Sequence, residues 1–187
     1  MTRAGSAPPP EGRPGHGFTL IELAIVLAMV GLLLAALLPT FNAMAARGQL
    51  LAAAQQLQAD IGLAREQASR LATPVHLSFQ PGAQWCYALS AEPSIDCRNT
   101  ATASTTATAA VIKRVVAADF PGVLLMDAQA MALDHRNGTR IGTAGQARFA
   151  SRAGQQLQVQ LGQLGRASLC APKEMITGTP ICAAASP

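Results

Sequence analysis

The sequence predicts an α+β protein in which one long N-terminal helix packs on a C-terminal head of antiparallel β-sheet. An almost unbroken apolar block covers residues 18–38, and apolar residues then recur with the period of a helix up to residue 71. After Pro74 the period changes to two, which is typical of strands. We therefore divide the chain into a leader over 1–17, a helix over 18–72 and a β-rich head over 73–187.

The first segment, residues 1–16, is polar and rich in proline and glycine, and its arginines favour a cytoplasmic flank. The composition changes abruptly at Gly17-Phe18. At about 1.5 Å per residue, residues 18–38 can cross a bilayer core of ~30 Å, so we expect a transmembrane segment there. An ordinary secretory signal has its cleavage site after a shorter apolar core. Here Gly17 precedes the block, so cleavage at this glycine would leave the helix on the mature chain.

One acidic residue, Glu22, interrupts the apolar block. A carboxylate within a bilayer costs about 2.5–3.5 kcal/mol or more, so such an acid usually has a partner or a function. Cleavage after Gly17 would create a cationic amine on Phe18, which lies on the same helix face as Glu22. Glu22 could pair with this amine or with that of a neighbouring subunit. The alternative is a protonated Glu22 near the membrane surface.

The segment from Gly17 to Leu23, Gly-Phe-Thr-Leu-Ile-Glu-Leu, resembles the prepilin processing motif of type IV pilins and type II secretion pseudopilins. The resemblance implies that the prepilin peptidase cleaves between Gly17 and Phe18 and then N-methylates Phe18. It also implies that Glu22 pairs with the amino terminus of an adjacent subunit during assembly. Pro39 stands where many such pilins carry a helix-breaking proline, and it should kink the helix or locally interrupt it.

Beyond Pro39 we expect the helix to resume as an amphipathic segment that ends at Thr73-Pro74. Polar residues, Asp60 among them, are expected to lie mostly off its apolar stripe. The stripe has spacings of three and four, which predict a face that packs against the head. Its members are Leu50, Ala54, Leu57, Ile61, Ala64, Ala68 and Leu71.

The head is expected to contain strands joined by turns, with Asn137-Gly138 as one turn signal. The expected strands cover 75–80, 85–89, 111–116, 123–126 and 157–161. Segment 99–110 contains only Asn, Thr, Ala and Ser, and we expect a flexible loop there. Consecutive strands without intervening helices predict an antiparallel sheet or a small sandwich packed on the helix.

The four cysteines fall into two local pairs, Cys86 with Cys97 and Cys170 with Cys182. Four cysteines allow three connectivities. We expect the two local pairings, because a membrane segment would place the head outside the cytoplasm, where disulfides persist. The alternative is that one or both pairs stay reduced. Neither pair has Cys-x-x-Cys spacing, so neither redox chemistry nor a zinc site is indicated.

The head resembles the GspH/FimT group of minor pilins and pseudopilins. The resemblance rests on Leu63-Ala64-Arg65-Glu66-Gln67-Ala68, Pro74-Val75-His76-Leu77, Trp85 and Leu164-Gly165-Arg166. It implies a minor structural subunit of a filament anchored in the inner membrane, for type II secretion or a type IV pilus. Its partners would be other pilins, bound through the N-terminal helix, and the prepilin peptidase, with the head in the periplasm.

No enzyme signature is present, and we expect neither catalysis nor a metal or other cofactor. The three histidines lack the spacing of metal ligands, and there is no Walker loop, Gly-x-Ser-x-Gly or His-Glu-x-x-His motif.

The alternative function is DNA binding for uptake. Some FimT-type minor pilins are thought to bind DNA through a C-terminal Gly-Arg-x-Arg motif, whereas this chain has Gly165-Arg166-Ala167-Ser168 and lacks the second arginine. Four further arginines could add a basic surface, as phosphate binding requires. They are Arg136, Arg140, Arg148 and Arg152. Aromatic residues, on which single-stranded bases stack, make up only 4% of the chain. DNA binding is therefore possible but not favoured.

Overall fold

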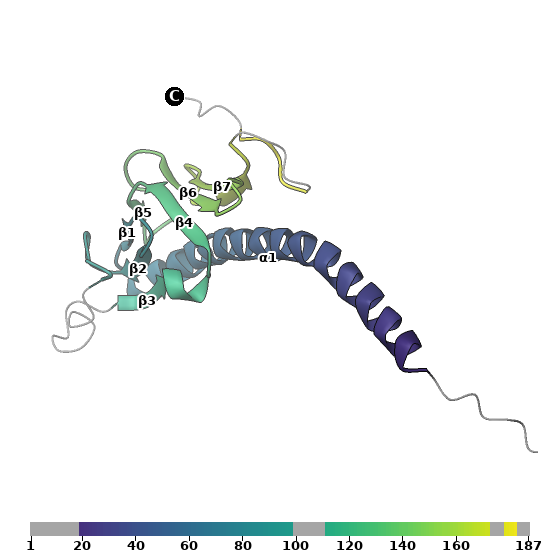
Figure 1. The fold of residues 1–187 in the computed structure, drawn as a ribbon. Helices are drawn as coiled ribbons and strands as arrows, with labels where there is room; N and C mark the ends of the chain where they lie inside the picture. The colour runs from purple at the N-terminus through teal and green to yellow at the C-terminus, as the bar shows by residue number, and fades with distance from the viewer. Residues whose placement is uncertain (1–18, 99–110, 173–177, 183–187) are drawn as a thin grey trace, which may run out of the picture. The chain divides into compact units, whose positions relative to one another are not determined.

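The computed structural model describes residues 19–98, 111–172 and 178–182 (Figure 1). These residues form the long helix α1 (Leu20–Leu71), the short 3₁₀ helix η2 (Ala117–Asp119) and eight strands. The expected leader 1–17, Phe18 and the expected loop 99–110 lie outside the described residues. The long helix followed by a strand-rich head is the architecture that the hydrophobic pattern predicts.

The strands form two antiparallel sheets of four strands each. The first sheet has the order β3-β2-β1-β5, and the second has the order β4-β6-β7-β8. The bounds are β1 Val75–Gln80, β2 Cys86–Ser90, β3 Val111–Val116, β4 Val123–Ala128, β5 Met131–Leu133, β6 Gly145–Ser151, β7 Gln156–Leu161 and β8 Ala167–Cys170. Five of these strands lie where the sequence predicts them, and β5, β6 and β8 were not predicted.

Helix α1 is continuous over 52 residues, and Pro39 lies within it. The local interruption that Pro39 could cause is therefore not observed. The helix ends just before Ala72, whose φ of 51° is the left-handed conformation in which many helices terminate. Residues Phe41–Pro187 form one compact unit, so the C-terminal part of α1 belongs to the head.

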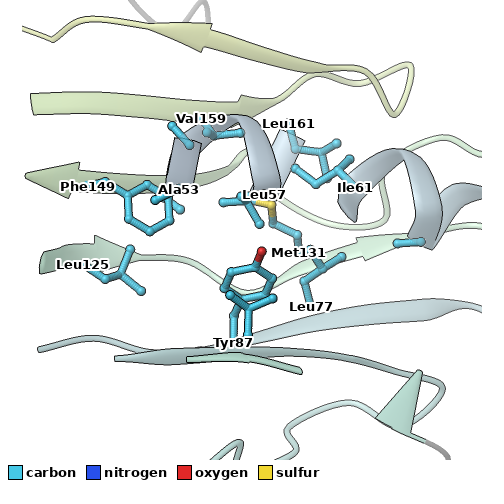
Figure 2. Close-up of a cluster of buried hydrophobic side chains, with 14 of the residues drawn as sticks. Ala53, Leu57, Ile61, Leu77, Tyr87, Leu125, Met131, Phe149, Val159 and Leu161 are labelled. Atoms are coloured by element: carbon cyan, nitrogen blue, oxygen red, sulfur yellow. The ribbon is translucent and has the colours of Figure 1, made fainter. Parts of the chain in front are cut away.

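The apolar stripe of α1 packs into the core between the sheets. Figure 2 shows side chains of the helix, the first sheet and the second sheet meeting in one cluster. Six of the seven stripe residues are fully buried, and the seventh, Leu71 at the helix end, is 47% exposed. Asp60 was expected off the stripe, but it is only 2% exposed, because strands β2 and β3 supply partners for its carboxylate.

Aromatic side chains connect the two sheets around Trp85. Its indole N–H donates to the Val123 carbonyl oxygen at 2.9 Å. Its ring lies 5.5 Å from the ring of Phe149, edge to face, and 6.2 Å from that of Tyr87. Trp85 is therefore a core residue, and its resemblance to the family pattern reflects packing.

Both local cysteine pairs are disulfides in the structure, with Cα–Cα distances of 5.9 Å for Cys86–Cys97 and 4.8 Å for Cys170–Cys182. Cys86, Ala88 and Cys97 form a small separate cluster. The second disulfide fastens Cys182 to the end of β8, next to a parallel bridge between Ala171 and Ile181.

Replacing both cysteines of either pair by serine is expected to lower the free energy of unfolding by about 2–3 kcal/mol, because each disulfide closes a short loop. Denaturant titration of the Cys86→Ser/Cys97→Ser variant measures this loss. Reduction of the unmodified chain serves as the control, and it should shift the midpoint at least as far. An unchanged midpoint in both experiments would contradict a stabilising role for the disulfide.

Candidate functional site

The N-terminal end of α1 carries the residues expected to act in assembly. Thr19 caps the helix: its Oγ1 accepts the N–H of Glu22 at 3.3 Å, and its carbonyl oxygen accepts the N–H of Leu23 at 3.2 Å. Threonine followed three residues later by glutamate is the sequence of a capping box. Glu22 thus lies in the first helical turn, where the helix dipole favours a negative charge. Gly17 and Phe18 lie outside the described residues.

The first turns of α1 expose large apolar side chains. Leu20 is 87% exposed and Leu32 is 74% exposed, and the large apolar residues between them are 45–70% exposed. Within the part of the chain that the structure describes, no helix has the length and hydrophobicity that a membrane crossing requires. The expected transmembrane segment 18–38 includes Phe18 and the side chains of 36–38, which are outside that part.

Of the arginines considered for DNA binding, Arg148, Arg152 and Arg166 do not form one surface. Arg152 lies beyond the C-terminal end of β6, near its turn into β7, whereas Arg166 lies in the turn from β7 to β8. These turns are at opposite ends of the second sheet, because the three strands are antiparallel neighbours. Arg148, in β6, forms an ion pair with Asp127 at 2.9 Å. The basic patch that phosphate binding requires is therefore not assembled from these residues.

The turn that contains Arg166 is held by close backbone packing. Gly165 has a φ of 71°, and a Cβ atom there would overlap the carbonyl oxygen of Gly138. Arg140 fastens the same region, because its Nη1 donates to the Leu161 carbonyl oxygen at 3.1 Å and its N–H donates to that of Gln163 at 3.0 Å. The Gly-Arg pair of the family pattern thus includes a glycine that packing requires.

A buried polar network that the sequence pattern did not reveal links α1 to the first sheet. The Oδ1 atom of Asp60 accepts Lys113 Nζ at 2.6 Å and Gln56 Nε2 at 3.0 Å, and its Oδ2 accepts the Tyr87 hydroxyl at 2.8 Å. Burial, together with the adjacent Asp60 carboxylate, raises the pKa of Tyr87 far above its usual range. The hydroxyl therefore remains a donor, and the network is structural.

The described residues show no group of three or more His, Cys, Asp or Glu side chains that could hold a metal ion. Among the histidines, His76 lies on β1, where burial lowers its pKa. His135 lies beside Asp134, with Nδ1 at 3.3 Å from the carboxylate. Neither arrangement brings together a nucleophile and a base.

Comparison with known proteins gives two family matches. A model described as type II transport protein GspH matches residues 53–165, which is more than half of the chain. A model of the prokaryotic N-terminal methylation motif matches residues 13–38. No curated protein matches the chain.

Two crystal structures of the type IV minor pilin FimU from Pseudomonas aeruginosa (strain PAO1) are similar to the chain. The form in space group P65 is 16% identical over 66% of this chain and 98% of its own, with a TM-score of 0.47. The P21 form is 16% identical over 68% of this chain and 95% of its own, with a TM-score of 0.49.

Proposed function

The chain belongs to the family of the type II transport protein GspH, and from this premise we propose how it is processed and assembled. It is a structural subunit of the minor pilin and pseudopilin class, whose members are anchored in the inner membrane and assemble into filaments. The observation that carries the proposal is a methylation motif at the start of a helix whose first turn contains Glu22.

The proposed maturation begins with the prepilin peptidase, which cleaves between Gly17 and Phe18 and methylates the new amine of Phe18. Residues 18–38 hold the unassembled subunit in the inner membrane, with the head in the periplasm. The exposed apolar residues from Leu20 to Leu34 support this proposal, because such a face is stable only in lipid or against other helices.

The proposed assembly step moves this helix from lipid into a bundle with the helices of other pilins. Glu22 then pairs with the terminal amine of an adjacent subunit, so cleavage creates the charge that the acid needs. Thr19 supports this role, because its cap keeps the first turn helical and holds Glu22 close to the new terminus. The subunit is not proposed to catalyse any reaction.

We expect Glu22→Val to impair assembly but not processing. The variant should lose its leader normally, while its incorporation into filaments should fall at least about tenfold, the factor that corresponds to 1.4 kcal/mol. Mass spectrometry of the membrane fraction measures removal of the leader. Immunoblotting of sheared filaments measures incorporation of the variant. Glu66→Val is the matched control, because Glu66 is an exposed acid on the same helix. Normal incorporation of Glu22→Val would disprove the pairing.

Two machines fit this role, the type II secretion pseudopilus and a type IV pilus. We propose the pseudopilus, because the matching family is described as a type II transport protein. Neighbouring genes for secretion components would support this assignment, and neighbouring pilus subunits would overturn it. The separation of Arg152 and Arg166 at opposite ends of the second sheet does not support the alternative in which the head binds DNA.

A further inference from the structure

Strand β3 forms one edge of the first sheet, and the described residues place no strand on its outer side. The outer strands β4 and β5 have further backbone contacts, through the bridges Gly82–Leu125 and Leu133–Arg140, respectively. The third outer strand, β8, is followed directly by the bridge Ala171–Ile181. At the end of β3, the N–H of Val116 points away from β2 and donates to Asp119 Oδ2 at 3.0 Å. Alternate residues of a strand direct their N–H groups to the same side, so that of Arg114 also faces outward.

A pocket of about 410 Å³ opens next to this edge. It is lined by Gln84, Trp85, Cys86, Arg98, Arg114, Val116, Ala117 and Ala118. The wall contains a buried aromatic residue and a disulfide cysteine, and the two arginines are exposed. The pocket therefore combines a partly buried wall with two cationic groups.

The two guanidinium groups of the pocket have no acidic side chain as an ion-pair partner among the described residues. Arg98 donates to the carbonyl oxygen of Pro81 at 3.1 Å. The nearby acids accept backbone N–H groups: Asp96 accepts that of Arg98 at 2.9 Å, and Asp119 accepts that of Val116. Both guanidinium groups are therefore without an ion pair among the described residues, and each can bind a carboxylate from outside the fold.

We propose that this face binds an extended, acidic segment of a partner protein. The backbone of the segment adds to the outer side of β3, as peptides do at exposed sheet edges. One of its carboxylates enters the pocket and accepts hydrogen bonds from Arg98 and Arg114, because guanidinium groups match carboxylates in geometry and charge. This interaction lies on the head, goes beyond the proposed function and does not require the N-terminal helix.

The test measures binding of a fluorescein-labelled peptide of alternating threonine and glutamate to the full chain in non-ionic detergent. Fluorescence anisotropy should show saturable binding that weakens as salt is added. Arg114→Gln should weaken binding at least about tenfold, which corresponds to 1.4 kcal/mol. Arg152→Gln is the matched control, because it removes an exposed arginine near the β6–β7 turn, outside the pocket lining, and should leave the affinity unchanged.

Further peptides separate the two parts of the proposal. Replacing each glutamate by glutamine should abolish binding, and methylating alternate backbone nitrogens should abolish it as well. Equal binding of the glutamine peptide would overturn the charge recognition, and equal binding of the methylated peptide would overturn the strand addition. The proposal also fails if inorganic phosphate displaces the peptide at the concentration at which the peptide itself competes, since the pocket is then a general anion site.

Discussion

Gly165→Ala is expected to lower the free energy of unfolding of the head by about 3 kcal/mol or more. Its φ of 71° costs an alanine about 1–2 kcal/mol. The added Cβ would also overlap the carbonyl oxygen of Gly138, so one of two backbone segments must move, and overpacking of this kind costs about 1–3 kcal/mol. Denaturant titration of the variant beside the parent chain measures the combined loss.

Two other glycines separate the conformational cost of a positive φ from the packing cost of the added Cβ. Gly154 has a φ of 83°, but a Cβ atom there would have no heavy atom within 4 Å, so Gly154→Ala should show the conformational cost alone. Gly62 lies exposed on α1 with open space around it, and Gly62→Ala should stabilise the helix by up to about 1 kcal/mol. If Gly165→Ala lowers the free energy of unfolding no more than Gly154→Ala does, Gly165 is not closely packed against Gly138.

The helix and most strands could be predicted because their patterns are local. The stripe from Leu50 to Ala68 repeats every three or four residues, and β1, β3 and β7 are rich in β-branched or alternating apolar residues. Strand β6 lacked such a signal, because Gly145–Ser151 contains mostly small and polar residues. Its pairing with both β4 and β7 places it in the sheet. Strand β5 has only three residues, and it depends on β1 in the same way.

The same difference between local patterns and long-range strand pairing decides which site residues could be predicted. The processing motif and Glu22 could be identified because the motif is one contiguous stretch of sequence at the start of a helix. The arrangement of Arg148, Arg152 and Arg166 could not be identified, because it depends on which strands pair and in which direction. Arg148 was also considered without its partner, since Asp127 reaches it only across the β4–β6 pairing.

Asp60→Ala is expected to lower the free energy of unfolding by about 3 kcal/mol. The helical pattern did not indicate this role, because it placed Asp60 off the apolar stripe. The substitution leaves Lys113 Nζ, the Tyr87 hydroxyl and Gln56 Nε2 without their acceptor. Removing one partner of a buried ion pair typically costs about 3–5 kcal/mol. We expect the low end, because the Lys113 side chain is 33% exposed and water replaces part of the lost interaction. Denaturant titration measures the loss.

Glu66→Ala is the matched control for Asp60→Ala, since the Glu66–Arg70 pair lies on the same helix with both side chains exposed. Its removal should cost less than about 1 kcal/mol. A loss for Asp60→Ala no larger than this would contradict the buried network.

The triple variant Asp60→Leu, Lys113→Met, Tyr87→Phe removes every strong donor together with the acceptor, and it should recover most of the stability that Asp60→Ala loses. A desolvated ion pair contributes little net free energy compared with well-packed apolar side chains of similar size. The value of the network would then be specificity, because Asp60 can satisfy Tyr87 and Lys113 only when α1 lies in one register on the first sheet. A triple variant that stays as unstable as Asp60→Ala would instead show that the polar contacts themselves stabilise the head.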